Sequence, residues 1–192
     1  MAPKSKATPK AKAPAKSKPA KDAAVAAEAV TETKAAPKDE AAENTLLLQL
    51  STGVVTIKLR PDLAPQHVAQ IKALAREGFY DGVVFHRVIP GFMAQGGDPT
   101  GTGMGGSKKP NLPAEFSKEP HVRGVCSMAR SANPNSANSQ FFICFDDARF
   151  LDGQYTVWGE VTDGMEHIDA LPKGEPPRAP GQIVSMKVAA DA

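Results

Sequence analysis

The sequence predicts a mainly β protein: a closed eight-stranded antiparallel β-barrel with two α-helices covering its openings, preceded by a disordered basic tail. Eight short segments rich in β-branched and aromatic residues are separated by clusters of Gly, Pro, Asn and Asp. Only two stretches have helical spacing, so the strand-helix alternation of a doubly wound α/β fold is missing. An antiparallel sandwich would share this pattern, and a barrel is the architecture we expect.

The tail spans residues 1–43 and the folded domain spans residues 44–192. Residues 1–43 contain 15 Ala, 9 Lys and 5 Pro but no Phe, Trp, Tyr, Leu or Ile, so they cannot offset the entropy of ordering. The tail has a net charge of +3 and the remainder a net charge of −1. Such a tail either solubilises the domain or contacts a polyanion, with nucleic acid as the natural candidate.

The eight predicted strands are residues 45–50, 54–59, 82–88, 92–97, 124–129, 140–145, 156–161 and 182–188. The first two form a hairpin, because a turn at Ser51 to Gly53 separates them and side chains alternate along 54–59. Within 140–145, Phe141 and Phe142 point to opposite faces, so at least one of them belongs to the core.

Two helices are predicted. The first lies within residues 64–78, where Val68, Ile71 and Leu74 recur at helical intervals, Pro65 suits the first turn and Gly78 a stop. The second is expected to begin near Thr162 or Asp163 and to end before Pro172.

Cysteine usage and hydropathy favour a cytoplasmic protein. Cys126 and Cys144 lie in apolar runs without CxxC spacing, which predicts buried free thiols. The longest uncharged apolar run near the N-terminus is AAVAA, too short for a signal peptide or a membrane span. We expect no membrane contact and a monomer.

The sequence does not support a nucleotide-binding, metal-binding or nucleophilic site. Gly101, Gly103 and Gly106 satisfy GxGxxG, but the prolines at 110 and 113 prevent the helix that a dinucleotide site requires. The four histidines are scattered without metal-ligand spacing, and no nucleophile elbow is present. We therefore expect no metal, no cofactor and no covalent intermediate.

The run FHRVIPGFMAQGGD places Arg87 in a β-branched stretch, on the same face as Phe85 and Ile89. One interpretation is an arginine whose stem packs on apolar surface while its head reaches water. The other is an apolar binding face with a single charged group that has a chemical task.

The motifs FHRVIPGFMAQGGD, NSQFFI and LDG, in this order, resemble the cyclophilins, which are peptidyl-prolyl cis/trans isomerases. The resemblance covers residues 45–189, and the short loops look most like those of compact bacterial cytoplasmic members. It implies an isomerase of class EC 5.2.1.8 that assists protein folding without a cofactor. Its partners would be proline-containing peptides and unfolded or folded client proteins.

The resemblance also assigns residues. It implies that Arg87 is catalytic, by donating a hydrogen bond to the prolyl nitrogen. The implied substrate-binding residues are Phe92, Met93, Gln95, Ala129, Arg130, Gln140, Phe142, Phe150, Leu151 and Tyr155. Where many members have tryptophan just before LDG, this chain has Phe150, which lacks the indole donor to the drug cyclosporin. We therefore expect weaker cyclosporin binding.

Two other functions remain open from the sequence. A peptide-binding or chaperone-like module would keep the apolar pocket but would not need Arg87. A nucleic-acid-associated factor would act mainly through the tail, with isomerisation secondary.

Overall fold

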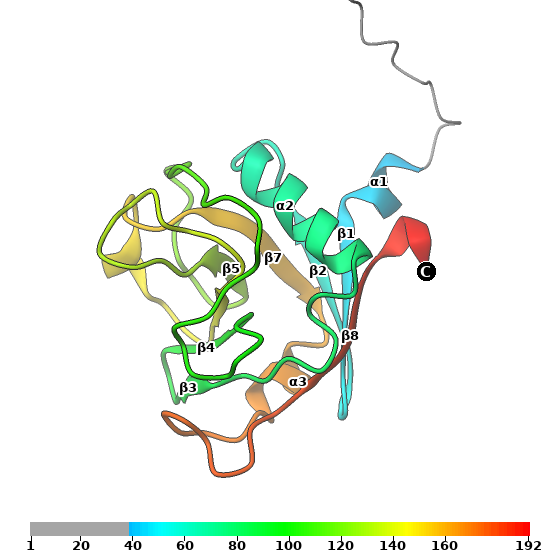
Figure 1. Cartoon of the computed structure of the whole chain (residues 1–192), viewed down its shortest axis with the longest axis vertical. Helices are drawn as coiled ribbons and strands as arrows, with labels where there is room; N and C mark the ends of the chain where they lie inside the picture. Colours follow the sequence, from blue (N-terminus) through cyan, green and yellow to red (C-terminus); the bar gives the residue numbers. More distant parts are fainter. Residues whose placement is uncertain (1–38) are drawn as a thin grey trace, which may run out of the picture. The chain divides into compact units, whose positions relative to one another are not determined.

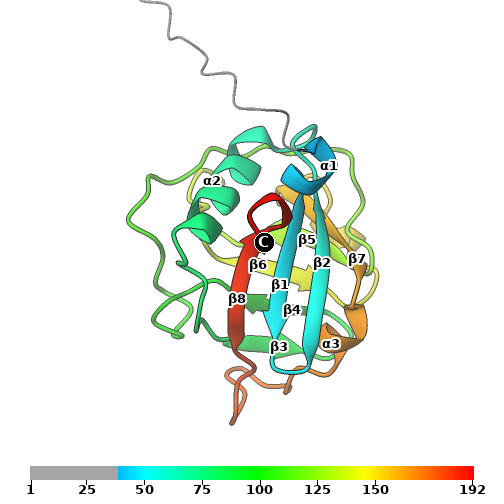
Figure 2. The same cartoon turned by 90° about the vertical axis from the view of Figure 1, so that its right-hand side faces the viewer.

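The structure, a computed structural model, describes residues 39–192. It consists of one eight-stranded antiparallel sheet in the order β3-β4-β6-β5-β7-β2-β1-β8. The strands are β1 (Thr45–Leu50), β2 (Gly53–Leu59), β3 (Arg87–Ile89), β4 (Met93–Gly96), β5 (Val125–Met128), β6 (Phe141–Cys144), β7 (Val157–Asp163) and β8 (Ile183–Val188). The helices are α1 (Glu40–Glu43), α2 (Pro65–Arg76) and α3 (Met165–Asp169), with 3-10 turns η1 (Arg149–Leu151) and η2 (Ala189–Asp191). Figure 1 and Figure 2 show the curled sheet with α2 and α3 towards opposite ends.

The eight antiparallel strands are confirmed, but the predicted closure of the barrel is not found in residues 39–192. Strands β3 and β8 are the edges of the sheet, and within the described residues no continuous ladder joins them. Two isolated bridges, Val84 to Gln182 and Val88 to Gly174, and a few backbone hydrogen bonds, such as that from the N–H of Phe85 to the carbonyl oxygen of Gly181 at 2.8 Å, connect the segments around these edges. Prolines at positions 172, 176, 177 and 180 precede β8, and proline has no N–H for a continuous ladder. The strand predicted at 82–88 is correspondingly reduced to the three residues of β3.

The registers of β3, β4, β6 and β5 create a core-facing row of side chains. Val88 pairs with Ala94, Ala94 with Ile143, and Ile143 with Cys126, and all four residues are completely buried. Because side chains alternate along a strand, the residues next to them in sequence lie on the opposite face of the sheet.

Phe141 lies at the centre of the aromatic core. Its ring makes edge-to-face contacts with Tyr80, Phe85 and Trp158, at centroid distances of 5.7, 6.2 and 5.8 Å. All four residues are fully buried. The alternation predicted for residues 141 and 142 is confirmed, since Phe142 belongs to a second apolar cluster on the other face.

Helix α2 confirms the predicted helix and buries Val68, Ile71 and Leu74. Ala64 at its N-cap offers no side-chain acceptor, and a distant carboxylate takes that role instead. Glu115 accepts hydrogen bonds from the N–H groups of Gln66 and His67, at 3.2 and 3.1 Å, and its Oε2 lies 2.6 Å from Nδ1 of His67. This satisfies N–H groups that the first helical turn leaves unpaired.

Two helical segments differ from the prediction. Helix α3 begins at Met165 rather than near residue 162, because β7 continues to Asp163. Helix α1 was not predicted, and it lies before the expected domain start at residue 44. Its Glu43 accepts hydrogen bonds from Lys72 and Arg76 of α2 at 3.3 and 2.9 Å, contacts that a sequence pattern does not reveal.

The predictions that the basic tail is disordered and that it could contact a polyanion concern mainly residues 1–38, which lie outside the described residues. Within residues 39–192, no helix is long and apolar enough to cross a membrane, and no group of three His, Cys, Asp or Glu side chains could hold a metal ion. Cys126 and Cys144 are free and buried, as predicted.

Phe141→Ala is expected to destabilise the domain by about 3–5 kcal/mol, because it leaves a cavity where three aromatic rings meet. Urea unfolding followed by circular dichroism measures this change. Phe116→Ala is the control, since Phe116 is 44% exposed, and it should cost less than about 1 kcal/mol. Equal losses for the two variants would contradict the assignment of Phe141 to the core.

Candidate active site

The candidate site lies on the face of β3, β4 and β6 that points away from the core row. Here Arg87 pairs with Gln95, and Gln95 pairs with Phe142, so three neighbouring strands place these side chains in one row. On the same face, Met93 of β4 pairs with Cys144 of β6. The arginine therefore lies beside an apolar cluster.

This face borders a cavity of about 190 Å³, which we call the apolar cavity. It is lined by Arg87, Phe92, Met93, Gln95, Ala129, Arg130, Phe142, Leu151 and Tyr155. Nine of the eleven site residues predicted from the sequence thus come together, although they derive from segments more than 60 residues apart. Their individual roles in substrate binding stay predictions.

The two remaining predicted residues lie next to the cavity without lining it. Phe150 in η1 is 65% exposed, and its ring centroid lies 5.4 Å from that of Phe92. Gln140 accepts a hydrogen bond from Nε2 of Gln95 at 3.0 Å and donates to the carbonyl oxygens of Gly103 and Gly105. Gln140 thus connects Gln95 of β4 to the glycine-rich loop, residues 101–106.

The two arginines of the cavity differ in their hydrogen bonding. Arg130 donates from Nε and Nη2 to the carbonyl oxygen of Gln154 and from Nη1 to that of Ser131, and it lies 4.6 Å over the ring of Tyr155. Arg87 donates only from Nε, to Oε1 of Glu175 at 2.7 Å. Among residues 39–192, the terminal nitrogens of Arg87 therefore have no hydrogen-bond acceptor, and they can bind a ligand.

The floor of the apolar cavity is the ring of Phe142, and neighbouring side chains hold this ring in place. The ring of Phe142 stacks on His121 at 6.2 Å and meets Tyr155 edge-on at 5.6 Å. His121 lies 3.0 Å from Asp152 Oδ1 through Nδ1 and 3.0 Å from Ser127 Oγ through Nε2. No sequence pattern assigns a role to His121, because only the fold brings these partners together.

Ser127, His121 and Asp152 have the order of contacts found in a nucleophilic triad, but this set cannot attack a substrate. Ser127 is completely buried, and its hydroxyl donates to the carbonyl oxygen of Thr156 at 2.9 Å. The set instead supports the aromatic floor. The expectation that no covalent intermediate forms stays a prediction.

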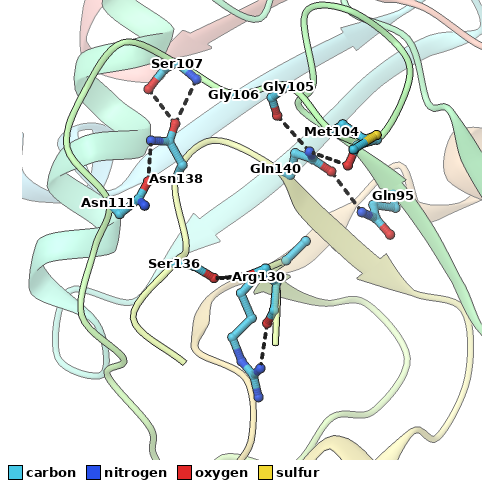
Figure 3. A pocket seen from close by; sticks show the side chains of 13 residues that line it. Gln95, Met104, Gly105, Gly106, Ser107, Asn111, Arg130, Ser136, Asn138 and Gln140 are labelled. Atoms are coloured by element: carbon cyan, nitrogen blue, oxygen red, sulfur yellow. Dashed lines mark hydrogen bonds between the residues drawn. The ribbon is translucent and has the colours of Figure 1, made fainter. Parts of the chain in front are cut away.

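A larger hollow of about 530 Å³ adjoins the apolar cavity, and we call it the polar hollow (Figure 3). It is lined by Gln95, Gly103, Met104, Gly105, Gly106, Ser107, Asn111, Ala129, Arg130, Ser131, Ser136, Asn138 and Gln140. Figure 3 shows the hydrogen bonds that fix its wall, including those from Ser107 to Asn138 Oδ1 and from Gln95 to Gln140. Gln95, Ala129 and Arg130 line both spaces.

Asp98 organises the glycine-rich loop that borders the polar hollow. Its fully buried carboxylate accepts hydrogen bonds from the N–H groups of Thr100, Thr102, Gly103 and Gly105 and from the hydroxyls of both threonines. Burial alone would raise the pKa of Asp98, but these hydrogen bonds outweigh it and hold the pKa well below its usual range.

His86 adds little positive charge beside Arg87. The ring is buried, and burial lowers its pKa, an effect that exceeds the attraction of the Asp98 carboxylate. Near neutral pH the imidazole is therefore uncharged. The guanidinium of Arg87 supplies the positive charge on this part of the face.

Residues 45–188 match the family model described as "Cyclophilin type peptidyl-prolyl cis-trans isomerase/CLD". A probable peptidyl-prolyl cis-trans isomerase of Brucella suis is 56% identical over 165 residues, covering 78% of this chain and 84% of the relative. A peptidyl-prolyl cis-trans isomerase of Synechococcus elongatus is 40% identical, covering 76% and 97% of the two chains.

The solved structures that superpose on this chain include cyclophilins. A cyclophilin from Hirschia baltica superposes with a TM-score of 0.73 at 33% identity, covering 79% of this chain and 76% of that one. A cyclophilin-type isomerase of Cryptosporidium parvum, crystallised in the presence of the dipeptide Ala-Pro, has a TM-score of 0.71 at 30% identity, covering 75% and 98%.

Asp98→Asn is expected to reduce stability at pH 7, and the difference from the parent should shrink as the pH falls. The pKa of Asp98 in the folded state is below that in the unfolded state, so the carboxylate stabilises the fold above its ordinary pKa of about 4. This contribution is lost progressively at lower pH. Urea unfolding between pH 7 and pH 2.5 measures it, with Asp163→Asn at the exposed end of β7 as control. A difference independent of pH would contradict the assignment.

Proposed function

We propose that Arg87 is the catalytic residue of this chain, which belongs to the cyclophilin-type family and is a peptidyl-prolyl cis-trans isomerase, EC 5.2.1.8. The proposed substrate is a peptide whose proline ring occupies the apolar cavity. The guanidinium then donates a hydrogen bond to the prolyl nitrogen as the peptide bond rotates. Assisted folding of client proteins is the proposed biological role.

The chemistry follows from the electronic structure of the X-Pro bond. Its rotation barrier of about 18–20 kcal/mol arises because the prolyl nitrogen delocalises its lone pair into the carbonyl group. In the twisted transition state this lone pair is localised and can accept a hydrogen bond. A donor placed there stabilises the transition state more than either planar ground state, which is the requirement for catalysis.

The observation that carries this proposal is the state of Arg87. Its terminal N–H groups have no acceptor within residues 39–192, and Arg87 lines the apolar cavity together with Phe92, Met93 and Phe142. Arg130 has committed Nε and both terminal nitrogens to backbone carbonyl oxygens. Of the two arginines, Arg87 is therefore the one available to a substrate.

The required rate enhancement is within the range of these effects. Shortening exchange from tens of seconds to about a millisecond needs roughly 6 kcal/mol. A preorganised donor in a partly desolvated site supplies about 2.7–4 kcal/mol in other enzymes. Holding the proline ring in the cavity while the preceding carbonyl rotates would supply the remainder.

The proposed ligand class has support from a neighbour. The Cryptosporidium parvum isomerase was crystallised in the presence of Ala-Pro, a dipeptide that contains proline. The cavity of this chain is of a size for a single small apolar ring and has aromatic residues on its floor and rim. We propose proline-containing peptides as the substrates here as well.

Arg87→Ala is expected to lower kcat/KM for a short X-Pro peptide by about 10²- to 10³-fold, the cost of losing one preorganised donor. The domain should stay folded, because the side chain is 44% exposed and fills no core volume. Arg87→Lys should recover only part of the loss, since one ammonium cannot reproduce the planar fork of the guanidinium.

The matched control is Arg123→Ala, which removes an arginine of similar exposure, 51%, from an ion pair with Asp169 outside the cavity. A protease-free isomerisation assay measures both variants. Activity of a folded Arg87→Ala variant within about threefold of the parent would show that Arg87 is only a surface residue of the strand.

Phe150→Trp is expected to strengthen inhibition by cyclosporin, because tryptophan adds an N–H donor that phenylalanine lacks. Phe150 is exposed beside Phe92 at the rim, so the larger ring can be accommodated without repacking the core. Inhibition titrations of parent and variant measure the change. An unchanged inhibition constant would mean that another residue limits binding of the drug.

A further inference from the structure

The segment before β8 is joined to β3 directly beside Arg87. The N–H of Val88 donates to the carbonyl oxygen of Gly174 at 2.8 Å, and the N–H of Gly174 donates to the carbonyl oxygen of Val88 at 2.9 Å. Gly174 has a φ of 148°, and a Cβ there would lie 2.7 Å from the Cα of Pro177. A glycine at this position therefore permits the close approach, and the next residue in the chain is Glu175.

Glu175 is the residue that contacts the guanidinium. Its Oε1 accepts the hydrogen bond from Nε of Arg87 at 2.7 Å, and the two side chains are 54% and 44% exposed. Nε is the nitrogen closest to the aliphatic stem. A bond at this atom fixes the orientation of the guanidinium plane and leaves the four N–H groups of the terminal nitrogens for a ligand.

No other described side chain provides this contact. Gln95 lies directly opposite Arg87 in the β3–β4 ladder, but its amide oxygen accepts no hydrogen bond from Arg87, and its amide nitrogen donates to Gln140. Within residues 39–192, the bond to Glu175 is the only hydrogen bond of the Arg87 side chain. An exposed arginine without such a bond would sample several rotamers, and each would direct the terminal nitrogens differently.

We propose that Glu175 is a positioning residue for the isomerase reaction, which holds Arg87 through Nε so that its terminal N–H groups face the bound peptide. This inference rests on the proposed catalytic role of Arg87. It assigns a function to the loop between α3 and β8, which contributes no residue to the lining of the apolar cavity. Glu175 itself does not touch the reacting atoms.

The expected effect is moderate, because exposed ion pairs contribute little energy. Glu175→Ala should lower kcat/KM for a short X-Pro peptide by three- to tenfold, mainly through kcat, since a misdirected donor weakens the transition state more than ground-state binding. Glu175→Gln should stay within about twofold of the parent, because the amide oxygen can still accept from Nε. Equal losses in the two variants would overturn the proposal.

Glu77→Ala is the matched control. Glu77 forms an ion pair of 2.6 Å with Lys109, its carboxylate is 56% exposed, and neither residue lines the apolar cavity. Its activity should equal that of the parent. Thermal unfolding of all variants verifies that the loss in Glu175→Ala does not come from a lower population of folded protein.

A double-mutant cycle separates this inference from the proposed role of Arg87. If Glu175 acts through Arg87, Glu175→Ala should have no further effect in the Arg87→Ala background. The same three- to tenfold loss in both backgrounds would overturn the positioning role and leave the role of Arg87 intact. An Arg87→Ala variant with nearly full activity would overturn the proposed catalytic role of Arg87, on which this inference rests. A gain of activity in Glu175→Ala would overturn the inference, since the carboxylate would then compete with the peptide.

Nitrogen-15 NMR provides a readout that a merely structural role would not change. The Nε–H signal of Arg87, identified by its disappearance in Arg87→Ala, should shift and broaden in Glu175→Ala and be largely restored in Glu175→Gln. The backbone amide signals of Val88 and Gly174 should stay in place. Loss of those backbone signals together with an unchanged Nε–H signal would overturn the proposal.

Discussion

The register of β3, β4, β6 and β5 is the constraint on which the site depends. One row across these strands, from Val88 through Ala94 and Ile143 to Cys126, is completely buried, while the neighbouring row begins with Arg87 and reaches Phe142. A slip of one residue would exchange the two rows, moving the guanidinium into the core and core side chains to the face of the candidate site. Burial of the first row therefore fixes the geometry of the second, and the aromatic cluster around Phe141 stabilises both.

Arg87 has one hydrogen bond among residues 39–192, from Nε to Glu175, and its terminal nitrogens have no acceptor there. The Asp98 carboxylate is close in sequence to the site, but the glycine-rich loop occupies it with hydrogen bonds. Arg130 satisfies backbone carbonyl oxygens and forms a wall over Tyr155. The two arginines of the cavity thus differ, because Arg130 donates to backbone carbonyl oxygens whereas the terminal nitrogens of Arg87 have no acceptor among the described residues.

Much of the fold was predictable because strands and helices leave periodic patterns, and α2 and the alternation at residues 141 and 142 are confirmed. The contacts that were not predictable are long-range. Glu115 caps α2 from 48 residues away, Glu175 reaches Arg87 across 88 residues, and His121 supports the cavity floor. Sequence patterns report local geometry, whereas these partners depend on where loops return to the sheet. A closed barrel is not found among residues 39–192, and the prolines in the segment before β8 lack the N–H donors that a continuous ladder needs.

The apolar cavity and the polar hollow have a common wall in Gln95, Ala129 and Arg130. Gln95 also stands opposite Arg87 and donates to Gln140, which in turn donates to the glycine-rich loop. A peptide that fills both spaces would contact this wall on each side of its proline. The glycine-rich loop is therefore linked by hydrogen bonds to β4, which pairs with the strand that carries Arg87. Under the proposed function, side chains that flank the proline would contact this loop and would influence turnover without touching the guanidinium.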